Sequence, residues 1–245
     1  MPLPEPAAGT SDDNGYPAWI AGLQCEEPNH TVLAVRDLGP ENALRLLGVP
    51  PEQIRPCELP AERPDKSTSL PRAAFGTQDA TGAVLLAGRI GAWTFIYDDG
   101  GITPLRARHG AHPAAVLSAD GRECVTSTRT INAATDLAYA AGGELLCHYT
   151  DGGGGLDEAA RGEEIPAGLR AAAAAAGVPG SGEPGEAGQG AAVNMRVLCA
   201  KAGLLECTVD DLRQIPLLVA PLGYDTSASP LLRELLGAPA PPSRE

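Results

Sequence analysis

The chain has 245 residues, 43% of them hydrophobic and 20% charged, proportions typical of a globular protein with a sizeable core. Its formal net charge of −13 argues against nucleic acid as a partner, because phosphate binding needs clustered cations. The amino terminus has no basic start followed by an apolar run, and no window approaches the roughly 18 apolar residues of a membrane helix. These features predict a cytoplasmic protein without membrane partners, whose six cysteines stay reduced.

The amino-terminal part of the chain predicts a few short elements separated by irregular segments. Residues 1–15 are rich in proline, glycine and acidic residues and predict disorder. A short helix is expected within residues 16–23 and a strand over residues 31–36. Pro40 suits a first helical position and Gly48 a helix end, so a helix is expected between them. The six prolines of residues 49–80 favour a long surface loop.

Residues 82–97 predict a buried hairpin with its turn near Gly91. Its first strand is apolar on both faces, which is typical of a strand with packing above and below it. Its second strand places Trp93, Phe95 and Tyr97 on one face. Because large rings bury about 150 to 250 Å² each, this face is expected to form the centre of the core.

The middle of the chain predicts more sheet. A short helix is expected over residues 113–119, followed by an alternating strand over residues 122–131. Residues 136–149 predict a second hairpin, in which Gly142 and Gly143 form a two-residue turn that needs positive φ. Short turns between strands favour antiparallel pairing.

The last hundred residues predict helices. The alanine run in residues 166–176 is expected to be helical and to end at Gly177, and apolar spacing over residues 193–204 predicts an amphipathic helix. Thr208 is expected to cap a further helix. Residues 178–190 predict a flexible insert, and residues 223–245 a short helix at 229–237 and a proline-rich tail. The expected fold is a single α+β domain over residues 16–222, with an antiparallel sheet of about six strands and the C-terminal helices packed on it.

Asp98 and Asp99 follow the aromatic strand directly, and either could act as an acid or base if a pocket closed over it. Aspartates before Gly-Gly are more often turn formers, so no catalytic residue is expected. Trp93 and Tyr97 would line such a pocket.

Arg106, Arg108, His109 and His112 form a locally basic stretch that could hold an anion or contact a partner. Cys147 and His148 could join these histidines as metal ligands, but adjacent strand residues point to opposite faces, so only one of the two could contribute. The tight paired spacing of most zinc sites is missing, so no metal is expected. No cofactor is expected either, because the Gly-x-Gly-x-x-Gly letters at residues 180–185 lack the strand that should precede them.

Several segments resemble an uncharacterised actinobacterial family of domains of unknown function. They are Trp19, residues 44–48 (Leu-Arg-Leu-Leu-Gly), residues 91–97 (Gly-Ala-Trp-Thr-Phe-Ile-Tyr), residues 116–121 (Val-Leu-Ser-Ala-Asp-Gly) and residues 137–145 (Leu-Ala-Tyr-Ala-Ala-Gly-Gly-Glu-Leu). The resemblance covers roughly residues 16–222 and includes an acidic residue after the Gly-x-Trp-Thr strand, where this chain has Asp98 and Asp99. It implies the fold and brings no activity with it.

The absence of a catalytic constellation, together with the acidity, favours a non-enzymatic protein-interaction module of the immunity or accessory kind, whose partner is a basic protein. The alternative is an enzyme or small-molecule binder with a pocket near Trp93, Tyr97 and Asp98.

Overall fold

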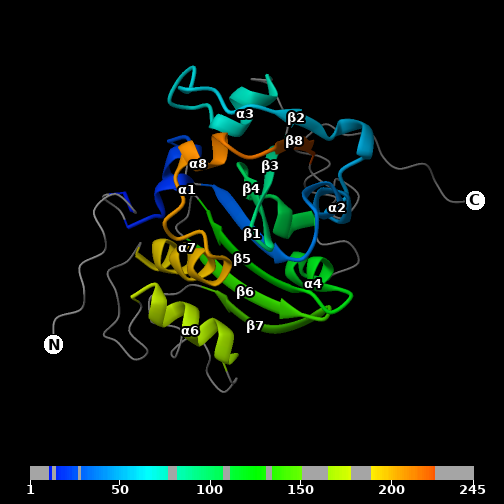
Figure 1. The fold of residues 1–245 in the computed structure, drawn as a ribbon, viewed down its shortest axis with the longest axis vertical. Helices are drawn as coiled ribbons and strands as arrows, with labels where there is room; N and C mark the ends of the chain where they lie inside the picture. The colour runs from blue at the N-terminus through cyan, green and yellow to red at the C-terminus, as the bar shows by residue number, and fades with distance from the viewer. Residues whose placement is uncertain are drawn as a thin grey trace, which may run out of the picture.

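The computed structural model describes residues 11–12, 15–26, 29–76, 82–106, 111–130, 134–150, 165–177 and 189–223. Its centre is one eight-stranded sheet with the order β2-β8-β3-β4-β1-β5-β6-β7, in which every neighbouring pair is antiparallel (Figure 1). The strands are β1 (His30–Arg36), β2 (Arg55–Cys57), β3 (Ala83–Ile90), β4 (Trp93–Asp98), β5 (Glu123–Arg129), β6 (Thr135–Ala141), β7 (Glu144–Thr150) and β8 (Leu217–Leu222). The expected α+β class and antiparallel pairing are confirmed, whereas the expected count of about six strands is too low.

The two additional strands, β2 and β8, lie together at one end of the sheet. β2 falls in the segment expected to be a surface loop, which also contains a 3-10 helix, η1 (Pro51–Gln53), and the helix α3 (Leu70–Phe75). β8 contains Pro221, a residue that usually argues against a strand because it cannot donate a backbone hydrogen bond. On one side of β8, the pairing with β2 ends at Val219, before Pro221. On the other side, Pro221 pairs with Val84, whose backbone N–H and C=O both bond to Asp99, so no donor is required from Pro221.

Helices cover both faces of the sheet (Figure 1). One face carries α7 (Gln189–Ala202), which packs on β1, β5 and β6, and α6 (Ala167–Ala175), which packs on α7. Nearby, α8 (Val209–Arg213) packs on α1 (Ala18–Leu23). The opposite face carries α2 (Pro40–Leu46) over β3 and β4, and α4 (Pro113–Ser118) over β5 and β6. The packing of C-terminal helices on the sheet is therefore confirmed.

Each face of the sheet has its own hydrophobic core, because side chains alternate along the strands. In β1, Val32 and Ala34 belong to the core under α7, whereas Leu33 and Val35 belong to the core under α2 and α4. Phe95 and Tyr97 lie in the first core as expected. Trp93, at the start of the same strand, is only partly buried and packs at the margin of that core.

A second aromatic group completes the first core. The fully buried Trp19, from α1, meets the Phe95 ring edge-on with 5.3 Å between the ring centroids. Trp19 and Tyr16 have the largest of the fully buried side chains, so the aromatic centre of the core is shared between α1 and β4. The β4 face expected at the centre of the core therefore contributes Phe95 and Tyr97 to it, together with Trp19 of α1.

The local signals for turns and helix ends are confirmed. Gly142 and Gly143 adopt φ of 61° and 87° between the paired Ala141 and Glu144. Gly177 has φ of 69° at the end of α6. The Thr208 hydroxyl accepts a hydrogen bond from the Asp211 backbone N–H, and the Asp211 carboxylate accepts one from the Thr208 backbone, which together form a capping box.

Parts of the expected organisation lie outside the described residues. These parts are residues 1–10, most of the insert expected at 178–190, and the helix expected at 229–237. Ser11 forms an isolated bridge with Pro17, and the Asp12 carboxylate accepts a hydrogen bond from the Tyr16 N–H, so the ordered body begins before residue 16. None of the helices in the described ranges is long and apolar enough to cross a membrane.

Candidate functional site

Tyr97 belongs to the core and lines neither of the two grooves described below. Its side chain is 1% exposed, and its ring stacks on the buried His30 ring with 5.8 Å between the centroids. Burial raises the pKa of the Tyr97 phenol well above its usual value. Trp93 lies at the margin of this core, with the Lys201 ammonium 5.9 Å from its ring centroid. The two residues therefore pack the α7 side of the sheet.

Asp98 is fully buried at the end of β4 and organises the turn that follows. Its Oδ2 accepts hydrogen bonds from the Thr103 N–H, at 2.6 Å, and from the Thr103 hydroxyl, and its Oδ1 accepts one from the Gly100 N–H at 3.1 Å. Burial raises the pKa of the Asp98 carboxyl to about 6, although the hydrogen bonds from Thr103 favour the charged form. The carboxylate thus fixes the backbone between β4 and η2 (Thr103–Arg106).

Asp99 joins α3 to the sheet. Arg72 donates from Nε to Oδ2 at 3.0 Å and from Nη2 to Oδ1 at 3.1 Å, a two-point contact between guanidinium and carboxylate. The Ser69 hydroxyl donates to Oδ2 at 2.6 Å, and the Val84 backbone N–H donates to Oδ1 at 2.6 Å. Both aspartates are therefore explained by the folding of the chain around them.

Two open surface grooves of the described chain lie elsewhere. One, of about 500 Å³, is bordered by Gly22 of α1, Arg63, Lys66 and Arg213. The other, of about 800 Å³, runs along β2 and the start of β8. Neither groove is lined by Trp93, Tyr97 or Asp98. Neither groove is therefore the pocket that the sequence analysis considered around these three residues.

The predicted basic stretch is described only in part. Arg108 and His109 lie outside the described residues, and Arg106 is described only as part of the backbone of η2. His112 is half-buried and caps α4, where its Nδ1 accepts a hydrogen bond from the Ala114 N–H at 3.1 Å. Burial lowers the pKa of His112, and the nearby His148 ring lowers it further.

Three side chains from separate elements meet on the α4 face of the sheet. They are His112 at the start of α4, Asp136 on β6 and His148 on β7, and one potential ligand atom from each lies within 4.8 Å of the other two. The His112 and His148 ring centroids are 4.9 Å apart, and His148 Nε2 lies 3.8 Å from Asp136 Oδ2. We call these three residues the His-Asp-His cluster.

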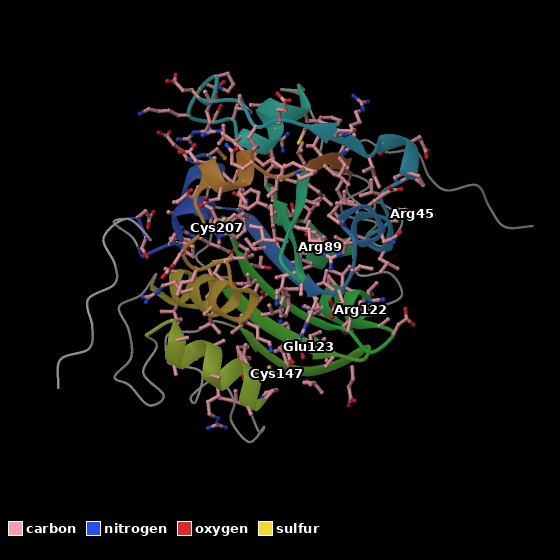
Figure 2. The ribbon with its side chains drawn as sticks, in the orientation of Figure 1. Arg45, Arg89, Arg122, Glu123, Cys147 and Cys207 are labelled. Atoms are coloured by element: carbon pink, nitrogen blue, oxygen red, sulfur yellow. The ribbon has the colours of Figure 1, made fainter. Side chains whose placement is uncertain are left out.

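Cys147 takes no part in this cluster. It is 2% exposed, belongs to the core on the α7 side and lies on the α6 side of β7 (Figure 2). The expectation that only one of Cys147 and His148 could join a ligand group is therefore confirmed. Asp136 is the member that the sequence analysis missed.

A β-bulge is the reason that Asp136 could not be foreseen. A regular hairpin with a two-residue turn at Gly142 and Gly143 would place His148 opposite Leu137. The register shifts by one residue between Tyr139 and Ala140, so His148 pairs with Ala138 and lies on the same face as Asp136. Sequence alternation alone cannot reveal such a shift.

Comparisons of this chain with protein-family models, with curated proteins and with solved structures found no match. The resemblance to the actinobacterial family therefore stays a prediction.

Proposed function

We propose that this chain is a cytoplasmic, non-enzymatic protein-interaction module whose β7 edge binds an extended, basic segment of a partner protein. The observation that carries this proposal is a pair of adjacent leucines on the outermost strand. Leu145 is 38% exposed and Leu146 37% exposed, and with Leu46 they are the only exposed large hydrophobic side chains in the described ranges. Large apolar side chains kept in water at a sheet edge are typical of a surface that another chain covers.

The strand order supports binding through the backbone as well. β7 is the last strand of the sheet, so along its outer side the described chain provides no neighbouring strand. The bulge lies next to the turn, and the pairing of β7 with β6 is regular from Cys147 to Thr150. An added strand would gain main-chain hydrogen bonds there and contacts with the leucines beside it.

The charge of the chain favours a basic partner. The formal net charge is −13, and Glu144 at the start of β7 is exposed. Opposite charge on the incoming segment would speed association and favour the correct partner, and added salt would weaken this steering. The alternative of a catalytic pocket has less support, because Asp98 is engaged in hydrogen bonds and Tyr97 is buried.

The experiment compares three variants as bait in co-purification from the native host. Leu145→Lys and Leu146→Lys each place a positive charge on the proposed surface. Leu46→Lys makes the same change at a leucine that is 40% exposed on α2, which packs over β3 and β4. We expect a basic partner that is captured by the parent and by Leu46→Lys, lost with both edge variants and released at moderate salt. Capture that is equal for all four baits would contradict the proposal.

A further inference from the structure

We propose that the His-Asp-His cluster binds one divalent transition-metal cation, with zinc as the representative ion. This departs from the absence of a metal expected from ligand spacing, because the three residues are far apart in the sequence and are brought together by the hairpin and α4. Two imidazoles and one carboxylate are ligands that zinc and related divalent ions accept in proteins. The site is independent of the partner surface proposed above, although both use β7.

The carboxylate is already oriented for such a role. Asp136 Oδ1 accepts a hydrogen bond from the Thr128 backbone N–H at 3.0 Å, which leaves Oδ2 directed toward His148 Nε2. The Ser127 hydroxyl donates to the Asp136 carbonyl at 3.0 Å and holds the same residue from its backbone. Hydrogen bonds of this kind fix the ligands of metal sites and raise their affinity.

The distances are close to those that one ion requires. Zinc binds imidazole nitrogen and carboxylate oxygen at about 2.0 to 2.2 Å, so two ligand atoms around a tetrahedral ion lie about 3.3 to 3.6 Å apart. The atoms of Asp136 and His148 are 3.8 Å apart, and no pair in the cluster exceeds 4.8 Å. The His148 side chain is 35% exposed and has room to move, so a small side-chain adjustment closes the site.

His112 couples metal binding to the cap of α4. Its Nδ1 accepts from the Ala114 N–H, so a neutral ring carries its proton on Nε2. A zinc-bound imidazole is neutral, so coordination through Nε2 requires the proton to move to Nδ1, which can then no longer accept from the Ala114 N–H. Binding is therefore expected to weaken the cap of α4. Three protein ligands leave a fourth position for water.

The test uses tag-free full-length protein, because affinity tags bind the same ions. Zinc is titrated by calorimetry, and cobalt is added as a spectroscopic probe whose visible absorption reports coordination by nitrogen and oxygen. We expect saturable binding of one ion per chain and no comparable binding of magnesium, which prefers oxygen ligands.

Three variants remove one ligand each with little effect on the fold. They are His148→Ala on the exposed strand, Asp136→Asn, and His112→Asn, which keeps a residue able to cap α4. Each is expected to weaken zinc binding by more than about tenfold. Mutation of a residue that only hydrogen-bonds to a metal ligand already weakens binding by about that factor, and these variants remove a ligand itself. Asp120→Asn is the control, because it removes an equal charge at an exposed site outside the cluster and Asn tolerates its φ of 60°.

The outcomes distinguish a metal site from a surface contact between histidine and carboxylate. Stoichiometric binding that is lost in all three ligand variants and kept in Asp120→Asn supports the proposal. The absence of saturable zinc or cobalt binding to the parent would overturn it, as would an affinity that the ligand variants leave unchanged. Circular dichroism of each variant without metal confirms that a lost signal does not come from unfolding.

Discussion

Arg72 and Asp99 form a two-point ion pair that ties α3 to the start of β3 and the end of β4, with donor–acceptor distances of 3.0 and 3.1 Å. The Asp99 side chain is 2% exposed and the Arg72 side chain 17% exposed, so little water screens the contact. Arg72 also donates to the Gly82 carbonyl at 3.0 Å. This one guanidinium therefore organises three segments that are distant in the sequence.

Asp99→Asn is expected to lower the free energy of unfolding by about 3 kcal/mol, because it leaves the largely buried Arg72 guanidinium, 17% exposed, without its counter-charge. The matched control is Asp37→Asn, which disrupts the exposed Arg36–Asp37 pair at a position where Asn tolerates the φ of 56°. Urea denaturation of both variants measures the difference. Equal denaturation midpoints for the two variants would show that the Asp99 pair contributes no more than a surface contact.

Asp98 is expected to make stability depend on pH between about 4 and 7. Its pKa is raised from 3.8 to about 6 in the folded chain, so the folded state holds the proton more tightly than the unfolded state. The resulting stabilisation is fully present below pH 3.8 and is lost as the pH rises through about 6. Two pKa units correspond to about 3 kcal/mol.

The variant Asp98→Asn cannot ionise at this position. The difference in free energy of unfolding between variant and parent should therefore change by about 2.4 kcal/mol in favour of the variant from pH 4 to pH 7, whatever its value at pH 4. Urea denaturation at four pH values in this window measures the difference directly. Parallel pH profiles for parent and variant would contradict the raised pKa.

The two lysines of the chain are expected to differ in their contribution to stability. Lys201 on α7 is 14% exposed, lies 2.8 Å from a Glu123 oxygen, and has the Trp93 and Tyr139 rings within 6 Å. Lys201→Met should lower the free energy of unfolding by about 2 kcal/mol through the lost charged and ring contacts. Lys66→Met, which removes an exposed pair with Glu26, should leave the denaturation midpoint nearly unchanged. Similar midpoints for both variants would refute this difference.

The six cysteines are present as thiols, and their reactivity should follow their burial. Burial raises the pKa of Cys57 and Cys207 to about 11, and it also raises the pKa of the fully buried Cys124 and Cys199. A thiol reagent at pH 8 should therefore modify Cys124, Cys147 and Cys199 only after denaturation. Mass spectrometry of labelled peptides identifies the sites, and rapid labelling of Cys124 in the native chain would contradict the burial.

Local signals in the sequence were sufficient for most individual elements. Helix starts were predicted correctly from Pro40 and Thr208, the hairpin turn from Gly142, and a helix end from Gly177. Each of these residues acts through the backbone of its immediate neighbours, so its effect can be read locally. Asp98 was also interpreted correctly as a residue that organises a turn, whereas Asp99 binds Arg72 and the Val84 backbone instead. The strand β8 was not predicted, and its Pro221 argues against a strand until its neighbours in the sheet are known.

The sequence by itself determined the fold class, the antiparallel hairpins and the acidic character, because alternation, turn residues and charge act locally or as sums over the chain. Only the tertiary structure decided that Trp93 lies at the margin of the core, that Arg72 joins Asp99, and that Asp136 meets the two histidines. Each of these depends on register or on packing between distant segments. A shift of one residue in β7 moves His148 to the other face, and no local pattern records that shift.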